Sequence, residues 1–312
     1  MITYRTPTNW TWIQAKQMEI EQLTPILEQE SSIDWLKQIQ NNKTNCLRVS
    51  ITPDGKKVVK GTLIYKQSFE EEHDVKFFHF YVTTDHWVTI DLDWDTLKHI
   101  DLQLLQSQIS QTTNAVEGFM LFIAEWMNAW LVEIDRFEED LKTLIWSIRK
   151  RNETSILELV YLRRHELLVW KSLLIPVKEL KMAIEEVNLH EPCEGKIFPM
   201  TCKRIERALT LLQEYEHELD SIINLEEVIS SHRGNEITKT LTVITTVFTP
   251  IMAFGALWGM NFKHMPELEW TWGYPLSIVM IVISTVLLYA YLRIKGWTGD
   301  LLKGKKRGSF FK

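Results

Sequence analysis

The sequence predicts an α+β membrane protein with an N-terminal cytosolic α/β domain, a long helical stalk continuous with a first membrane span, and a second span near the C-terminus. Three observations support this fold class. Strand-like segments occur only within the first 110 residues, helical spacing dominates after residue 114, and two uncharged stretches, 240–262 and 270–292, each hold 23 residues. A helix of that length spans roughly 34 Å, slightly more than the hydrocarbon thickness of about 30 Å. The two stretches therefore predict a membrane hairpin.

Residues 1–110 are expected to form the α/β domain. A helix-like start covers Thr11–Gln40, and segments rich in Val, Ile, Thr and aromatic residues then predict strands at Cys46–Thr52, Lys57–Gln67, Val75–Thr83 and Trp87–Leu92. Pro53-Asp54-Gly55 supplies a hairpin turn between the first two strands. Acidic residues follow two of the strands, and they form either solvated loops or a cation-sensing patch, at Glu70–Asp74 and at Asp91, Asp93 and Asp95.

Residues 111–198 are expected to form two long antiparallel helices. Apolar residues recur at steps of three and four from Asn114 to Lys150, and again from Glu153 to about Val187. The short Arg151-Asn152 junction favours an antiparallel pair, and Pro176 predicts a kink or a register break in the second helix.

Residues 199–262 are expected to form one helix that is both stalk and first membrane span, with its membrane part at about 240–262. Helical spacing resumes after Pro199 and shows no stop signal before Gly234. A single glycine costs about 1 kcal/mol in helix propensity and does not end a packed helix. Continued to Trp258, this helix holds 60 residues and measures about 90 Å.

A loop at 263–272, the second span at 273–292 and a basic tail at 293–312 complete the chain. The tail carries a net charge of +6 against −6 for the whole chain, which leaves −12 for residues 1–292. The positive-inside rule therefore puts this tail in the cytoplasm. The first 16 residues contain no signal-peptide core, so we expect both termini to be cytoplasmic.

Three short motifs near the C-terminus define a resemblance. Gly259-Met260-Asn261 closes the first span, Met265-Pro266-Glu267-Leu268 lies in the loop, and Trp272-Gly273-Tyr274-Pro275 opens the second span. In this arrangement the chain resembles the CorA family of divalent-cation channels over roughly residues 235–297, and the remainder agrees mainly in layout. The resemblance implies passive transport of Mg²⁺, with Co²⁺ and Ni²⁺ as further candidates. It also implies a homo-oligomer, a pentamer, with five stalks around a central axis.

One face of the first span carries the residues expected to line the pore. Side chains at steps of three or four form this stripe, namely Asn235, Thr238, Thr242, Thr245, Thr249 and Met252. The stripe either faces a water-filled axis or serves helix packing, since Thr hydroxyls also bond to their own helix backbone. Relatives often carry bulky apolar residues at the positions aligned with Thr238 and Thr249. Here Leu241 or Met252 is the candidate for a hydrophobic constriction.

The motif Gly259-Met260-Asn261 is the predicted selectivity filter. Mg²⁺ gives up its water reluctantly, so a ring of Asn261 side-chain oxygens would suit the hydrated ion. Gly259 would allow close approach at the axis, and Met260 would pack against neighbouring helix ends. On spacing alone, a role of Gly259 and Asn261 as helix C-caps is as well supported as an ion contact. The resemblance to the family motif is what favours Asn261 as an ion contact.

The acidic residues of the loop have two possible functions. Glu267 and Glu269 either raise the cation concentration at the outer mouth or only keep the loop soluble. No cofactor is expected besides Mg²⁺ as the transported ion and as a candidate regulatory ion, and no acid at the start of the stalk matches the sensor acids of relatives. A weaker candidate is a zinc site, from the spacing of His190, Cys193 and Cys202. An odd number of cytosolic cysteines argues against a disulfide framework.

The sequence carries no phosphate-binding Gly-rich loop, no Gly-x-Ser-x-Gly and no His-Glu-x-x-His, so an enzyme is not expected. The basic tail is attributed to anionic lipid rather than to nucleic acid. We expect a homo-oligomer in the plasma or inner membrane, with two spans per chain in the lipid bilayer. Rival functions are transport of Zn²⁺ or another divalent cation by the same architecture, or a membrane-anchored scaffold or sensor without transport.

Overall fold

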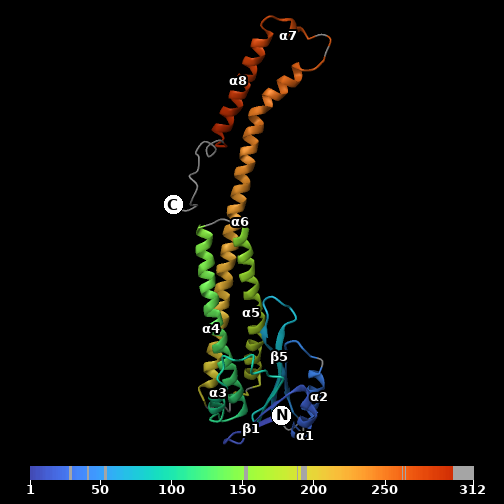
Figure 1. The fold of residues 1–312 in the computed structure, drawn as a ribbon, viewed down its shortest axis with the longest axis vertical. Helices are drawn as coiled ribbons and strands as arrows, with labels where there is room; N and C mark the ends of the chain where they lie inside the picture. The colour runs from blue at the N-terminus through green and yellow to red at the C-terminus, as the bar shows by residue number, and fades with distance from the viewer. Residues whose placement is uncertain are drawn as a thin grey trace. The chain divides into compact units, whose positions relative to one another are not determined.

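The computed structural model describes residues 1–27, 30–40, 42–52, 55–150, 154–187, 189–190, 195–261, 263 and 265–297 (Figure 1). The chain divides into two compact units, Met1–Asp220 and Ser221–Lys312. Helix α6, Ile197–Trp258, is continuous across this division, as its helical spacing predicted.

Within the described residues, six strands of the first unit form one sheet in the order β1-β2-β6-β5-β4-β3. Four of them confirm the strands predicted from composition, with ends that agree or differ by at most two residues: β3 Cys46–Ile51, β4 Lys57–Gln67, β5 Val75–Val82 and β6 His86–Ile90. Strands β3 and β4 pair antiparallel, as the predicted hairpin requires. Gly55 has φ +79° and donates its N–H to the Thr52 carbonyl, while Pro53 and Asp54 lie outside the described residues.

The expectation of a helix-like start at Thr11 was wrong, because Thr11–Ala15 is strand β2. This strand pairs antiparallel with β1, Ile2–Arg5, and parallel with the distant β6. Trp12 and Ile13 point to opposite faces of the sheet and both are fully buried, an arrangement that a one-sided helix cannot provide. Helical structure begins only afterwards, with the short 3₁₀ helix Gln17–Glu19, α1 Ile20–Leu27 and α2 Glu30–Ile39.

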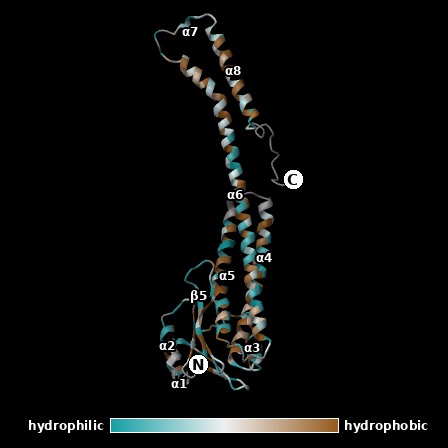
Figure 2. Ribbon diagram, turned by 180° about the vertical axis from the view of Figure 1, so that it is seen from behind, coloured by the Kyte–Doolittle hydropathy of each residue, from teal (hydrophilic) through white to brown (hydrophobic). Residues whose placement is uncertain are grey.

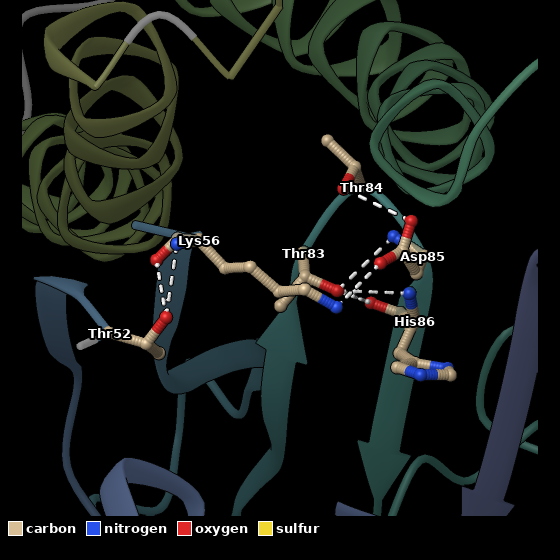
Figure 3. Close-up of polar contacts among 6 residues, drawn as sticks. All are labelled: Thr52, Lys56, Thr83, Thr84, Asp85 and His86. Atoms are coloured by element: carbon tan, nitrogen blue, oxygen red, sulfur yellow. Dashed lines mark hydrogen bonds and ion pairs between the residues drawn. The ribbon is translucent and has the colours of Figure 1, made fainter. Parts of the chain in front are cut away.

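Two turns at one end of the sheet are held together by polar contacts (Figure 3). Lys56, from the β3–β4 turn, places its ammonium 3.1 Å from a carboxylate oxygen of Asp85 in the β5–β6 turn. The Thr83 hydroxyl accepts hydrogen bonds from the backbone N–H groups of Asp85 and His86. These contacts align the ends of strands that are distant in sequence.

The acidic residues after β6 organise their own loop. Asp91 accepts a 2.9 Å hydrogen bond from the backbone N–H of Gln17, and Asp93 accepts from Asp95 N–H and from the Thr96 hydroxyl. The bond from Thr96 is the largest cause that lowers the pKa of Asp93. These contacts give the carboxylates a structural role.

Both faces of the sheet are covered. One packs against α1 and α2 through a cluster that includes Trp35, Tyr81 and Leu23. The other carries stacked indoles, with ring centroids of Trp12 and Trp87 4.5 Å apart, and meets α4, Ala115–Lys150. Helix α3, Leu102–Ile109, starts at the N-cap Asp101.

Helices α4 and α5, Thr154–Glu186, confirm the two long helices expected there, and they run antiparallel (Figure 1). Asn114 caps α4 by accepting a 2.9 Å hydrogen bond from Glu117 N–H. The start of α6 is joined to them by ion pairs, which include Lys171–Glu216 at 2.7 Å and Arg204–Glu125 at 3.1 Å. Pro176 lies inside α5, which continues on both sides of it.

The second unit contains the remainder of α6, the short helix α7, Pro266–Glu269, and α8, Gly273–Ile294. Helix α7 lies within the segment predicted to be a loop. In Figure 2, α8 and the part of α6 nearest α7 are mostly brown, the hydrophobic end of the scale.

Candidate ion pathway

Among the described residues, three helices are long and apolar enough to cross a membrane. They differ in how much of their apolar surface is buried inside the protein. In Ala115–Ser147 of α4, 78% of the most apolar window is buried inside the first unit. The corresponding shares are 11% in α6 and 6% in α8. The apolar residues of α4 are therefore used by a protein core, whereas those of α6 and α8 are left for another apolar environment.

The predicted stripe lies on one exposed side of α6. At 3.6 residues per turn, Asn235, Thr238, Thr242, Thr245, Thr249 and Met252 project within about a third of the helix circumference, with Leu241 at its edge. Val243 and Pro250 are buried and project from the opposite side. In α8 the buried residue is Leu292. One side of α6 is thus covered within the unit, and the stripe side is free.

Every threonine of the stripe bonds to its own helix backbone. The hydroxyls of Thr238, Thr242, Thr245 and Thr249 donate to the carbonyl four residues earlier, at 2.9, 2.8, 2.8 and 2.7 Å. Thr240 and Thr246, outside the stripe, do the same. These hydrogen bonds from Thr hydroxyls to backbone carbonyls therefore do not distinguish a face that lines a pore from a face that packs against another helix. It does fix the hydroxyl hydrogens inward, so each Oγ offers only lone pairs to its surroundings.

The two candidate constriction residues both extend from the helix. Leu241 is 63% exposed and Met252 is 57% exposed. Either side chain is long enough to narrow a path formed by several copies of α6.

The predicted filter motif, Gly259-Met260-Asn261, begins where α6 ends. The N–H of Gly259 donates to the Gly255 carbonyl at 3.0 Å, and a Cβ at position 259 would lie 2.9 Å from that oxygen. Since real Cβ atoms do not approach so closely, this ending fits glycine. Met260 is 48% exposed, and the Asn261 side chain is exposed and makes no hydrogen bond to another described residue.

Two further features lie near this end of α6 and in α7. Phe254 stacks on Trp258 with ring centroids 5.3 Å apart, a contact that the i, i+4 spacing of two aromatic residues could have revealed. Glu269 is exposed at the end of α7, and Glu267 belongs to the same helix.

No group of three His, Cys, Asp or Glu side chains converges on a metal position in the described part of the chain. His190 stacks on Phe198 with centroids 4.9 Å apart, and burial raises the pKa of the Cys202 thiol to about 11, which disfavours the thiolate that zinc needs. Cys193, the third residue of the suggested zinc site, lies outside the described residues.

Comparison with known proteins assigns a family to this arrangement. The family model described as CorA-like Mg²⁺ transporter protein matches residues 9–294. The chain belongs to the CorA family. Among its relatives, the magnesium transport protein CorA of Bacillus subtilis is 43% identical over 97% of this chain and 96% of its own length. The cobalt/magnesium transport protein CorA of Thermotoga maritima is 23% identical over 54% of the chain and 48% of its own length.

The complete structure of the CorA magnesium transporter from Methanocaldococcus jannaschii has the same fold. It matches with a TM-score of 0.59 at 18% identity, covering 93% of this chain and 92% of that one. The α+β fold class and the resemblance to CorA are therefore confirmed. As a member of this transporter family, the chain is a membrane protein.

Proposed function

We propose that copies of this chain assemble in the cell membrane and pass Mg²⁺ down its electrochemical gradient along an axis lined by the stripe of α6. The observation that carries the proposal is the position of the stripe in a CorA-family chain. It is exposed, lies opposite the covered side of α6, and leads to Gly259-Met260-Asn261. The name of the Bacillus subtilis relative, 43% identical, supports Mg²⁺ as the ion.

The chemistry of the stripe suits a cation that keeps its water. Hydrated Mg²⁺ presents the hydrogens of its coordinated waters outward, so the surrounding wall must accept hydrogen bonds. The Thr hydroxyls, with their hydrogens committed to backbone carbonyls, are acceptors only on their outer side. Asn261 would add a ring of amide oxygens at the outer end, which recognises the hydrated ion without stripping it.

We propose that the chain forms a homo-oligomer, specifically a pentamer. A single α6 helix lines only one side of an ion path, so several copies are needed to surround it. The stripe of each copy would face the common axis, and its opposite side would remain against α8 and lipid. Leu241 or Met252 would then form a ring of apolar side chains, and such rings close channels by excluding water.

Transport of this kind needs no ATP. An inside-negative potential favours inward movement by about 2.3 kcal/mol per elementary charge and 100 mV, and a divalent ion gains twice that. Glu269, with Glu267, would raise the local concentration of cations at the outer mouth. Mg²⁺ also remains the candidate regulatory ion, acting between copies through the acidic cytosolic part, and the proposal requires no other cofactor, no nucleic acid and no enzymatic step.

The proposed topology has two spans, α6 and α8, in the plasma or inner membrane, with both termini in the cytoplasm. Burial of α4 inside the first unit supports two spans rather than three. The net charge of +6 in residues 293–312 supports a cytoplasmic C-terminus.

The deciding experiment measures Mg²⁺ uptake into liposomes that contain the purified protein and an internal Mg²⁺ indicator. We expect uptake driven by an inside-negative potential, and loss of selective uptake in Asn261→Ala. Asn128→Ala, which removes an amide of α4 that donates hydrogen bonds to Glu125, is the matched control and should leave uptake unchanged. Absence of uptake in the wild-type protein would favour a scaffold. Stronger uptake of Zn²⁺, Co²⁺ or Ni²⁺ than of Mg²⁺ would favour the rival ions.

A further inference from the structure

The first unit contains a cavity that has no part in the α6 path. It has a volume of about 290 Å³ and lies between the end of β4, the loop after β6, and helices α4 and α5. All of its lining residues belong to Met1–Asp220, so its geometry is defined within one unit.

Five aromatic rings line this cavity as a connected series, which we call the aromatic cage. From the interior to the mouth, the centroid distances are 6.3 Å for Tyr65–Trp126, 4.8 Å for Trp126–Trp130, 5.5 Å for Trp130–Trp170 and 6.0 Å for Trp170–Phe69. Three of these contacts are edge-to-face, so neighbouring rings are turned steeply relative to one another. Tyr65, Trp126 and Trp130 are buried, Trp170 is half-buried and Phe69 is 37% exposed. The cage is therefore closed at one end and open at the other.

A carboxylate forms part of the wall. Glu133 of α4 lines the cavity beside Trp130, and its side chain is half-buried. Its ion-pair partner is Arg136 at 2.7 Å, whose side chain is 65% exposed, so this pair is screened by water and weak. The remaining polar lining comes from Gln67, Thr96 and His99, and from Lys66, whose positively charged side chain is exposed to water.

We propose that the aromatic cage binds a small organic ammonium ion. The faces of Trp and Tyr rings attract cations, most strongly where water is excluded, and Glu133 supplies the opposite charge. A metal cation is a poor fit, because Mg²⁺ requires several oxygen ligands and the walls are mainly carbon. The volume suits a trimethylammonium or primary ammonium group with a short substituent, at the small end of ligand pockets.

The test compares two probes of equal shape. Choline and its neutral analogue, in which a tert-butyl group replaces trimethylammonium, are titrated by calorimetry into the purified full-length protein in detergent. Both bury the same apolar area, so only the charge distinguishes them. We expect choline to bind about tenfold more tightly than the neutral analogue.

Two variants and one control locate the site. Trp170→Leu removes the ring at the mouth, Glu133→Gln removes the charge at nearly constant shape, and each should weaken choline binding several-fold. Trp146→Leu, an exposed indole of α4 that does not line the cavity, should leave binding unchanged. Circular dichroism checks folding, and Glu133→Gln still decides the outcome if Trp170→Leu fails to fold. The proposal is overturned if choline does not bind, if the neutral analogue binds equally well, or if Trp146→Leu weakens binding as much as the cage variants.

Discussion

The hydroxyl of Thr249 donates a 2.7 Å hydrogen bond to the carbonyl oxygen of Thr245, one turn earlier in α6. The same contact recurs from Thr245 to Leu241 and from Thr242 to Thr238. A repeated bond of this kind turns the hydroxyl donors of the four stripe threonines inward. What remains outside is a row of oxygen acceptors, which is the surface that a hydrated cation requires.

This relationship predicts that Thr249→Val slows Mg²⁺ uptake by about fivefold, the effect of one hydrogen bond worth roughly 1 kcal/mol. Valine keeps the shape and removes the acceptor. The measurement is the initial rate of uptake into liposomes. Thr240→Val is the matched control, because Thr240 bonds to the Glu236 carbonyl in the same way but projects from the opposite side of α6. Equal rates in the two variants would refute the pore-facing stripe.

A second prediction concerns the end of α6. Gly259→Ala adds a methyl group 2.9 Å from the Gly255 carbonyl oxygen, so the backbone that leads to Asn261 must shift. We expect loss of most Mg²⁺ uptake without loss of the folded first unit, measured by uptake and by circular dichroism on the same preparation. In the control Gly234→Ala, the added methyl group meets no atom within 4 Å. Normal uptake by Gly259→Ala would argue against a geometric role for Gly259.

A third prediction concerns the loop. Glu269→Gln should lower uptake about twofold at low ionic strength, and the difference should shrink in physiological salt, where the Debye length is about 8 Å. Initial rates across a series of salt concentrations measure this. The control is Glu227→Gln, which removes an exposed acid from the part of α6 before the apolar stretch. A reduction that does not depend on salt would indicate a structural role for Glu269.

Much of the fold could be predicted because it depends on local periodicity. The spacing of apolar residues marked α4, α5 and α6 to within a few residues, and richness in Val, Ile, Thr and aromatic residues marked β3 to β6. Strand β2 was missed because its parallel partner, β6, lies 75 residues further along the chain and no local pattern indicates that pairing. Gly118 shows a similar limit, because the ring that leaves no room for a side chain there belongs to Trp10, which is distant in the sequence.

The candidate site could be predicted only as a face of one helix. Spacing placed Thr238 to Met252 on one side of α6, but the burial of Val243 and Pro250 on the other side came from the structure. Residues that surround a symmetric axis come from different copies, so neither spacing nor the fold of one chain determines whether Leu241 or Met252 is closest to that axis. The aromatic cage includes Tyr65, Trp126 and Trp170, which come from three separate segments, so no local sequence pattern predicts it.

A fourth prediction follows from His79 on β5. It is buried, its Nδ1 lies 2.7 Å from the Thr62 hydroxyl, and burial lowers its pKa from 6.5 to about 4, with nearby Asp91 opposing the shift. The unfolded chain then binds a proton that the folded chain does not as pH falls below 6.5. Stability should therefore be full above pH 6.5, decline by about 3 kcal/mol as pH falls to about 4, and lose nothing further from this group below that.

Thermal melting of the detergent-solubilised protein across this pH interval measures the effect. His79→Asn removes the titrating ring, so its melting temperature should change less with pH than that of the wild type, whatever the loss at neutral pH. His73→Gln, in the exposed loop before β5, should retain the wild-type slope. An unchanged slope in His79→Asn would assign the acid sensitivity to other groups.

The last prediction compares the substitution of two glycines, Gly118 in α4 and Gly234 in α6. Alanine favours helix over glycine by about 1 kcal/mol, so both Gly118→Ala and Gly234→Ala gain propensity. At Gly118 in α4, however, the new Cβ would lie 2.5 Å from the ring of Trp10, which is buried and bonded to the Thr112 carbonyl and cannot move aside. Overpacking costs about 1–3 kcal/mol, so Gly118→Ala should lower the melting temperature. Gly234→Ala meets no atom and should raise it, and a rise in both variants would show that the Trp10 contact yields.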